Sequence, residues 1–327
     1  MRAIQFSQFG QPLDVLNLID LPLPEPRPGQ IRLRFTHRPI NPSDFATIKG
    51  EYGRLPKLPA VPGLEGMGTV AALGAGVAGL QIGRRVIPFG IRGGSWAEYG
   101  LANADLVLPV PDELSDQTAA QFLGNPVSAW MMLEDELDLQ AGDWVLQTAA
   151  GSTLGRLVLQ IAQLQGYKTV NFVRRREQVQ ELLDLGADAV ICTQDVDVVA
   201  QVKALTGGKG VKGALEAVGG QTGALAVSCL APGATMIVYG SLSGEPIPLH
   251  SGEILFRGNT VRGFWLTYRL RTTPSAELMP VLARLMQLMT TGQIVPPVEA
   301  EYDLADFKKA VVHADTPGRS GKVILIG

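Results

Sequence analysis

The spacing of apolar residues divides this chain into regions of different character. Between about residue 119 and residue 265, short apolar runs alternate with stretches in which apolar residues recur every three or four positions. Short unbroken runs are typical of buried strands, and the longer period is typical of helices. After a helical segment at 117–136, we expect strands over 144–149, 169–173, 189–191, 214–218 and 235–239, separated by helices over 157–164, 177–185, 198–205 and 222–230. This alternation predicts a doubly wound parallel sheet with helices on both faces.

The residues on either side of this region predict a second, β-rich domain. Residues 31–35 alternate apolar and polar side chains, as a half-buried strand does, and the turn signal Asn41-Pro42 follows closely. Nearer the C-terminus we expect a strand over 261–266, helices over 276–289 and 303–313 and a closing strand over 323–326. The prediction is an α/β protein in which a nucleotide-binding domain, 119–265, interrupts a β-rich domain, 1–118 and 266–327.

Charge and cysteine usage argue against several kinds of partner. The 327 residues include 28 basic and 31 acidic side chains, a balance that favours neither nucleic acid nor an anionic membrane. The two cysteines and three histidines lack the spacing of a zinc cluster, and so few cysteines fit a reducing compartment. The N-terminus shows no basic segment followed by an apolar run, so we expect no signal peptide. We predict a cytoplasmic protein without a membrane partner.

The loop after the first parallel strand has the composition of a phosphate-binding turn. A pyrophosphate needs close approach of the backbone and free N–H groups at the start of a helix. The small residues at the start of this loop permit that approach, and Gly155 lets the helix pack on the strand. In the pattern G-x-G-x-x-G the first two glycines are replaced here, so an ordinary strand-to-helix turn remains an alternative. The predicted cofactor contacts are Ala150, Gly151, Ser152, Thr153, Leu154 and Gly155.

Arg174, Arg175 and Arg176 follow the second parallel strand, at the position that selects between dinucleotide cofactors. An acidic residue there binds the ribose hydroxyls of NAD, whereas arginine accommodates a 2′-phosphate. No carboxylate occurs before Glu177. A solvated helix start is the other interpretation, but three positive charges oppose the dipole of a helix N-terminus, and a bound phosphate would offset them. We predict NADPH as the cofactor, without a choice among the three arginines.

Short sequence blocks spread over nearly the whole chain support a family assignment. With them the chain resembles the zinc-independent quinone oxidoreductase and mitochondrial-type 2-enoyl thioester reductase branch of the medium-chain dehydrogenase/reductase superfamily. The resemblance implies a Rossmann domain that binds NADPH and a GroES-like catalytic domain. The blocks are Asn41-Pro42-Ser43-Asp44, Gly50-Glu51-Tyr52-Gly53, residues 58–66, Gly94-Ser95-Trp96-Ala97-Glu98-Tyr99, Gly142-Asp143-Trp144-Val145, Leu185-Gly186-Ala187-Asp188, Val218-Gly219-Gly220 and Arg262-Gly263-Phe264-Trp265-Leu266.

Two positions within the resemblance imply that no metal takes part. The zinc alcohol dehydrogenases of the superfamily place a cysteine ligand where this chain has Asn41, and a histidine where it has Leu64. A zinc ion would polarise the oxygen of an alcohol or carbonyl. Without it, reduction of a quinone, or of a C=C bond conjugated to a carbonyl, needs only hydrogen-bond donors for the oxygen that becomes negative.

Tyr52 and Asn41 are the predicted catalytic residues. Tyr52 matches the tyrosine that the resembling thioester reductases place at the substrate carbonyl, and a phenol is protonated at neutral pH and so would donate. Asn41 would face the nicotinamide or its ribose. The resemblance implies that Trp265 lines the acyl side of the substrate pocket together with Tyr52. The other interpretations are that Tyr52 caps the cleft, that Asn41 only begins a turn, and that Trp265 is a core residue.

The resemblance implies further cofactor contacts at scattered positions. They are Asn125, Tyr239, Gly240, Phe264, Trp265 and Lys322. For Lys322, a contact near the ribose or phosphates and a solvated strand start are both consistent with the sequence. The hydroxyl of Ser128 follows Asn125 at a position where the family often has threonine, and Glu65 is expected to have a structural hydrogen-bonding role.

These features together predict NADPH-dependent reduction of a conjugated carbonyl compound, a 2-enoyl thioester or a 2-alkenal, by hydride transfer to its β-carbon. The alternative is an NADPH:quinone oxidoreductase that uses the same residues. A hypothesis from another class is a non-catalytic, nucleotide-regulated RNA-binding or crystallin-like relative. We expect a homodimer, because in the resembling family the fifth and sixth strands of the cofactor domain often pair across a two-fold axis.

Overall fold

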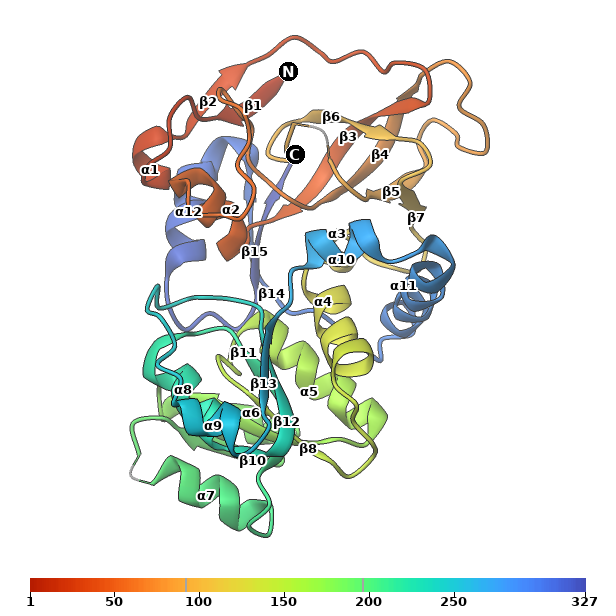
Figure 1. Cartoon of the computed structure of the whole chain (residues 1–327). Helices are drawn as coiled ribbons and strands as arrows, with labels where there is room; N and C mark the ends of the chain where they lie inside the picture. The colour runs from red at the N-terminus through yellow and green to blue at the C-terminus, as the bar shows by residue number, and fades with distance from the viewer. Residues whose placement is uncertain (92, 196) are drawn as a thin grey trace. The chain divides into compact units, whose positions relative to one another are not determined.

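The computed structural model describes residues 1–91, 93–195 and 197–327. The chain forms two compact units (Figure 1): a discontinuous unit of residues 1–124 and 286–327, and an inserted unit of residues 125–285. The sequence predicted these divisions at 118/119 and at 265/266. In the structure the second division lies within a helix, α11 (Ser275–Thr290), so the end of the sheet and the end of the unit do not coincide. No helix in the described part of the chain has the length and apolar character needed to cross a membrane.

The inserted unit contains a six-stranded parallel sheet. Its strand order is β10-β9-β8-β11-β12-β13, so the chain starts in the middle, builds outward to one edge and then returns to build the other half. This is the order of dinucleotide-binding folds, and it confirms the predicted doubly wound sheet. The elements are α4 (Asn125–Met131), the π-helix η1 (Met132–Glu136), β8 (Trp144–Gln147), α5 (Thr153–Gln165), β9 (Lys168–Val173), α6 (Glu177–Asp184), β10 (Ala189–Cys192), α7 (Val198–Leu205), β11 (Val211–Glu216), α8 (Gly220–Ser228), β12 (Leu230–Val238), α9 (Ser251–Leu255), β13 (Thr260–Gly263) and α10 (Leu266–Thr272).

Two predicted elements of this region have a different form in the structure. The helix expected over 117–136 is divided into α3 (Asp116–Ala120), α4 and η1. The strand expected over 261–266 ends at Gly263, and α10 begins three residues later. Periodicity missed α10 because this helix has only seven residues and buries none of them, so its periodic signal is weak.

The discontinuous unit is built around a seven-stranded sheet. The order along it is β14-β15-β3-β4-β5-β7, and β6 also pairs with β3. The C-terminal strand β15 lies antiparallel to β3, which confirms that the end of the chain returns to the β-rich region. Its elements are β1 (Arg2–Gln5), α1 (Pro12–Val15), β2 (Asn17–Asp20), β3 (Gln30–Pro39), α2 (Pro42–Lys49), β4 (Met67–Leu73), β5 (Arg85–Pro88), β6 (Tyr99–Asn103), β7 (Val107–Pro109), α3, β14 (Val298–Asp303), the 3-10 helix η2 (Leu304–Asp306), α12 (Phe307–Asp315) and β15 (Lys322–Ile326).

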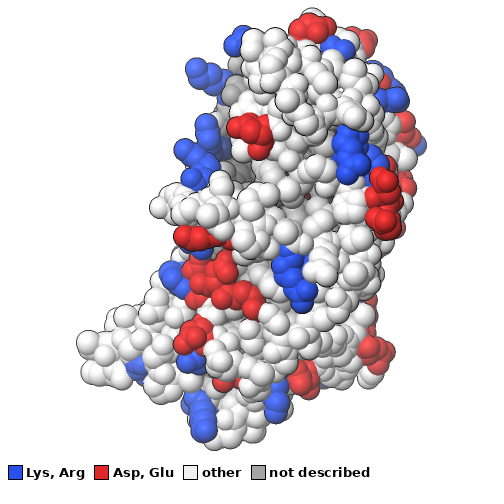
Figure 2. Space-filling view, turned by 90° about the vertical axis from the view of Figure 1, so that its right-hand side faces the viewer, with Lys and Arg blue, Asp and Glu red and all other residues white. Residues whose placement is uncertain are grey.

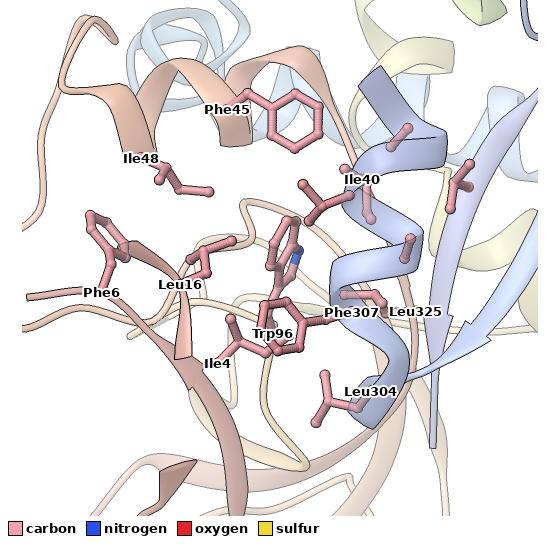
Figure 3. Close-up of a cluster of buried hydrophobic side chains, with 14 of the residues drawn as sticks. Ile4, Phe6, Leu16, Ile40, Phe45, Ile48, Trp96, Leu304, Phe307 and Leu325 are labelled. Carbon is pink, nitrogen blue, oxygen red and sulfur yellow. The ribbon is translucent and has the colours of Figure 1, made fainter. Parts of the chain in front are cut away.

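A core around Trp96 joins the beginning and the end of the chain within this unit. The Trp96 side chain is fully buried, and side chains of β1, α2 and α12 surround it (Figure 3). The backbone is tied in as well, since the Ile4 N–H donates to the Trp96 carbonyl at 2.8 Å. Gly63 must be glycine here: its φ is +101°, and a Cβ would lie 2.4 Å from Trp96 Cδ1.

Arg38 on β3 is a fully buried cation that pairs with backbone carbonyls instead of a carboxylate. Its Nε donates to Ser95 O at 3.0 Å, and its Nη2 donates to Ala97 O at 2.9 Å and to Gly327 O at 2.7 Å. Burial lowers the pKa of Arg38 to about 9, so the side chain is still charged at neutral pH. Arg38 therefore holds together β3, the segment before β6 and the C-terminus.

Candidate active site

Helix α2 carries both predicted catalytic residues at its two ends. Asn41 precedes its first residue, and Tyr52 follows its last turn, just beyond Gly50. Gly50 has φ +83° and ends the helix in the left-handed conformation that glycine adopts without strain. The eight residues between the ends span about 12 Å at the rise of an α-helix. Asn41 is therefore placed at the start of this helix and Tyr52 in the loop just after it, with Asn41 buried and Tyr52 half-buried.

The side-chain amide of Asn41 lies between a carboxylate and an ammonium group. Its Nδ2 donates to Glu65 Oε1 at 2.6 Å, and its Oδ1 accepts a hydrogen bond from Lys322 Nζ. Both partners are almost fully buried, Glu65 at 4% and Lys322 at 5% exposure. These contacts fix which way the amide points, and they leave one N–H of Nδ2 for another acceptor. Lys322 is therefore buried at the start of its strand and not solvated there. Its contact with the cofactor stays a prediction.

Asp44 adds a second buried carboxylate to this group. Its oxygens accept from Asn41 N at 2.8 Å and from Leu64 N at 3.0 Å, which joins the start of α2 to the loop that contains Leu64. Burial raises the pKa of Asp44 to about 7, although the two backbone donors oppose this shift. Burial also lowers the pKa of Lys322 to about 8, while Glu65 and Asp44 oppose that change.

Glu65 connects this buried group to the point where the chain leaves the discontinuous unit. Besides Asn41, its carboxylate accepts a hydrogen bond from Gly124 N at 2.7 Å, and its main-chain oxygen accepts one from Ser95 Oγ at 2.6 Å. A Cβ at position 124 would lie 2.7 Å from the carboxylate, so only glycine fits. Burial raises the pKa of Glu65, and the nearby Lys322 opposes the shift. The expected structural hydrogen-bonding role agrees with these contacts.

In the inserted unit, the loop from β8 to α5 has the geometry of a phosphate cradle. Ala149 adopts φ +50°, and Ser152 caps α5 by accepting from Gly155 N at 3.1 Å. In the described part of the chain, the N–H groups of Thr153 and Leu154 have no hydrogen-bond acceptor, as expected at a helix start. These donors, with the positive end of the helix dipole, fit an anionic diphosphate.

Close packing against backbone requires glycine at position 155. A Cβ there would lie 2.3 Å from Ala150 O, whereas a Cβ on Gly151 would lie 2.1 Å from Nε2 at the flexible end of the Gln178 side chain. Ala150 is fully buried, so this alanine replaces the first glycine of the fingerprint by contributing to the packing beneath the loop. The loop therefore keeps the shape of the dinucleotide-binding turn with only two glycines.

The three arginines after β9 differ in their partners. Arg176 forms an ion pair with Asp195 at 2.5 Å. Neither Arg174 nor Arg175 has an ion pair with another described residue; Arg174 is exposed and Arg175 is half-buried. Two of the three guanidinium groups are thus available to an anion, and the third is already paired with a carboxylate.

Other predicted cofactor positions lie at the carboxyl ends of strands or at the start of helices. Asn125 begins α4, and Ser128 lies in its first turn. Tyr239 and Gly240 follow β12, and the Tyr239 hydroxyl is buried without a hydrogen-bond partner in the described structure. Their contact with a cofactor stays a prediction.

The residues after β13 complete the predicted set in the inserted unit. Phe264 is 7% exposed, and its N–H donates to Val238 O at 2.8 Å; Trp265, by contrast, is 36% exposed at the start of α10. A core position for Trp265, the alternative that the sequence left open, does not agree with this exposure. Its place in a substrate pocket stays a prediction.

Sequence reasoning missed Glu216 and Gln147, two polar residues at the carboxyl ends of the central strands β11 and β8. Glu216 is fully buried at the carboxyl end of β11, where its Oε1 accepts from Val218 N at 2.6 Å and from Gly219 N at 2.9 Å. Gln147 at the end of β8 donates to Gly155 O at 3.0 Å. The signal was present, since both are polar residues that end otherwise apolar strands at adjacent positions in the sheet.

Comparison with known proteins places this geometry in a family. Residues 27–112 match the alcohol dehydrogenase GroES-like domain, and residues 153–284 match the zinc-binding dehydrogenase model. The chain is 34% identical to the mitochondrial enoyl-[acyl-carrier-protein] reductase of Rattus norvegicus, over 99% of this chain and 88% of the relative. It is 35% identical to that of Caenorhabditis elegans, over 95% and 90%. The chain belongs to the medium-chain dehydrogenase/reductase superfamily, in its quinone oxidoreductase and enoyl reductase branch.

Solved structures of this superfamily share the fold. A putative NADPH:quinone reductase from Bacillus thuringiensis is 33% identical, with a TM-score of 0.93 over 100% of this chain and 98% of that one. Quinone oxidoreductase of Escherichia coli, solved in complex with NADPH, is 25% identical, with a TM-score of 0.91 over 100% of both chains. The predicted combination of a GroES-like and a Rossmann domain is confirmed. The matched model is named for zinc, whereas this chain has Asn41 and Leu64 at the two positions discussed above, so zinc independence stays a prediction.

Replacing Lys322 by Met is expected to lower the free energy of unfolding by about 3 kcal/mol at pH 8, because the buried Glu65 and Asp44 carboxylates lose their cation. Burial raises the pKa of both carboxyls above the values in the unfolded chain, so both take up protons more readily in the folded state as the pH falls. The deficit should therefore shrink between pH 8 and pH 5, as Asp44 passes through its pKa of about 7.

Urea unfolding at pH 8 and pH 5, followed by tryptophan fluorescence, measures this deficit. Lys309→Met is the control, because the Lys309 side chain is 74% exposed and its ion pair with Asp306 is at the surface. A deficit of the same size at both pH values would show that Lys322 stabilises the fold by packing and not by its charge.

Proposed function

We propose that this protein reduces a C=C bond conjugated to a carbonyl group, in a 2-enoyl thioester or a 2-alkenal, with NADPH as the reductant. Enoyl reductases that match almost the full length of the chain support the proposal most directly. The structure supports it through α2, which holds a buried amide and a half-buried phenol at its two ends. When bound, NADPH supplies the hydride that the β-carbon of the substrate accepts.

The loop from Ala149 to Gly155 fits the diphosphate of this cofactor. It offers the free N–H groups of Thr153 and Leu154 at the start of α5, and Gly155 has no room for a side chain against the Ala150 backbone. Asn41 contributes the N–H that Glu65 leaves unused, and the Lys322 contact keeps the amide from turning over. We assign Asn41 to orienting the nicotinamide or its ribose.

Tyr52 supplies the donor that the chemistry needs. As the β-carbon gains the hydride, negative charge develops on the carbonyl oxygen, and a phenol O–H placed there stabilises it in a site without bulk water. The reduction is complete when the α-carbon takes up a proton. Tyr52 acts in this scheme as a hydrogen-bond donor and not as a base.

The quinone alternative has its own support, since a solved structure with a TM-score of 0.93 is described as a putative NADPH:quinone reductase. Steady-state rates with NADPH and crotonyl-CoA, 2-alkenals and 1,4-quinones separate the two. Turnover of quinones alone would contradict the thioester proposal and leave the cofactor site intact.

The non-catalytic hypothesis receives less support. RNA binding needs a continuous basic surface. On the face shown in Figure 2, basic and acidic side chains are intermixed. A failure of NADPH to quench the protein's fluorescence would favour this hypothesis over both enzymatic ones. A cytoplasmic location stays a prediction, because the relatives named above are mitochondrial.

A homodimer formed through the inserted unit is part of the proposal. Strand β13 is an edge of the parallel sheet, so one side of its backbone has no strand neighbour. The segment just before it exposes Leu255 at 71% and Phe256 at 84%. Among the neighbours, a 2-enoyl thioester reductase of Candida tropicalis, 25% identical with a TM-score of 0.89 over 100% of this chain and 99% of that one, was solved as a heterodimer.

The change Phe256→Glu is expected to convert a dimer into a monomer, because it places a charge in an apolar interface that must be desolvated. Light scattering on a gel-filtration column measures the mass. Val312→Glu, at a 53% exposed position on α12, is the matched control and should leave the mass unchanged. A wild-type mass equal to one chain contradicts the dimer.

The change Tyr52→Phe is expected to lower kcat for crotonyl-CoA about 100-fold, as found when one hydrogen-bond donor to a developing oxyanion is removed. The dissociation constant for NADPH should stay within about twofold, since the phenol faces the substrate. Tyr99→Phe changes a half-buried tyrosine of β6 and serves as the control. An unaltered kcat would remove Tyr52 from the mechanism.

Removing Arg174 and Arg175 together, by changes to Ala, is expected to raise the dissociation constant for NADPH at least tenfold, because charge-assisted hydrogen bonds of about 1.5–3 kcal/mol are lost. Binding of NADH, which lacks the 2′-phosphate, should change little. Arg176→Ala is the matched control, since this guanidinium is paired with Asp195. Equal losses for NADPH and NADH would argue against a 2′-phosphate contact.

A further inference from the structure

Helix α10, which follows Trp265, has little hydrophobic anchoring. None of its seven residues is buried, and its first turn has no side-chain cap. An isolated helix of this length is unstable in water. Phe264 before it is buried, so the position of α10 depends on contacts made by its partly exposed side chains.

Glu136 contacts two arginines, one before and one after Trp265 in the sequence. Its Oε2 forms an ion pair with Arg262 Nη2 at 2.9 Å, and its Oε1 forms one with Arg269 Nε at 3.2 Å. Arg262 also donates to the main-chain oxygen of Glu136. Arg262 lies three residues before Trp265 and Arg269 four residues after it. One carboxylate thus joins the strand before this tryptophan to the helix after it.

Glu136 is the more buried member of both pairs. Its side chain is 12% exposed, whereas Arg262 is 46% and Arg269 33% exposed, so solvent screens the pairs mainly from the arginine side. Glu136 ends η1, the π-helix that continues α4, and irregular turns of this kind occur often at functional sites. The residue two positions earlier, Glu134, points to a different part of the unit: it accepts from Tyr167 OH at 2.9 Å and from Gln165.

We propose that Glu136 is a positioning residue which, through Arg262 and Arg269, fixes the Phe264–Trp265 segment as a wall of the substrate pocket. The inference rests on the proposed function for its kinetic consequence, together with the predicted place of Trp265 on the acyl side of the substrate pocket. Loosening the segment removes binding that is equal in the ground and transition states, which raises KM and leaves kcat nearly unchanged.

The test compares Glu136→Gln with Glu134→Gln, two changes of the same kind in the same π-helix. Glu136→Gln should raise the KM for crotonyl-CoA about tenfold, with kcat within threefold of the wild type. Glu136→Asp, which keeps the charge, should recover part of the loss. Glu134→Gln should leave the KM unchanged. An unchanged KM in Glu136→Gln, or an equal rise in both Gln variants, overturns the proposal.

Hydrogen exchange supplies a readout that does not depend on activity. In Glu136→Gln the amides of residues 264–272 should exchange at least tenfold faster than in the wild type, whereas in Glu134→Gln they should not. If exchange rises as expected but no thioester or enone is turned over, the clamp is correct and the proposed function fails. If exchange in this segment is unchanged, the clamp is wrong whatever the substrate.

Discussion

The contact between Lys322 and Asn41 is the interaction on which the catalytic half of this protein depends. The two residues are 281 positions apart, and they meet because β15 returns to pair with β3. Burial works against each charge of this group: it lowers the pKa of Lys322 and raises the pKa of Glu65, and the two opposite charges each oppose the shift of the other. The group therefore needs its members together, and the C-terminal strand contributes to the candidate active site.

The same contacts bear on the role of the Asn41 amide, at the position where the zinc enzymes of the superfamily have a cysteine. A thiolate at this position would bind a metal, whereas Asn41 is held between a donor and an acceptor and keeps one N–H available. In the proposed function, this N–H orients a neutral group of the cofactor, and Tyr52, in the loop after α2, stabilises the charge that develops on the substrate.

In the inserted unit, the requirement is that backbone N–H groups come close to an anion. Its sheet changes direction between β8 and β11, and the polar residues that end these strands hold the loops there: Gln147 binds Gly155 O, and Glu216 binds the N–H groups that follow β11. The side chains of Arg174 and Arg175 then extend from the neighbouring strand β9. In the proposed function, the exposed Arg174 and the half-buried Arg175 select NADPH, and largely buried residues shape the loop that binds it.

The sequence by itself predicted the parallel sheet, the loop at Gly155 and the arginines after β9. Each of these depends on residues close together in the chain, so local period and motif suffice. Asn41 and Tyr52 were predicted from the family resemblance, and their catalytic roles stay a prediction. Short-range pattern could not show that Lys322 lies beside Asn41 or that Glu136 joins Arg262 to Arg269, since these contacts cross long intervals of sequence. It also missed α10, which is only seven residues long and buries none of them, and β14, whose residues are mostly exposed although apolar and acidic side chains alternate along it. Only the tertiary structure decided which charged residues pair with each other, because a charge is buried where the whole fold supplies its partner.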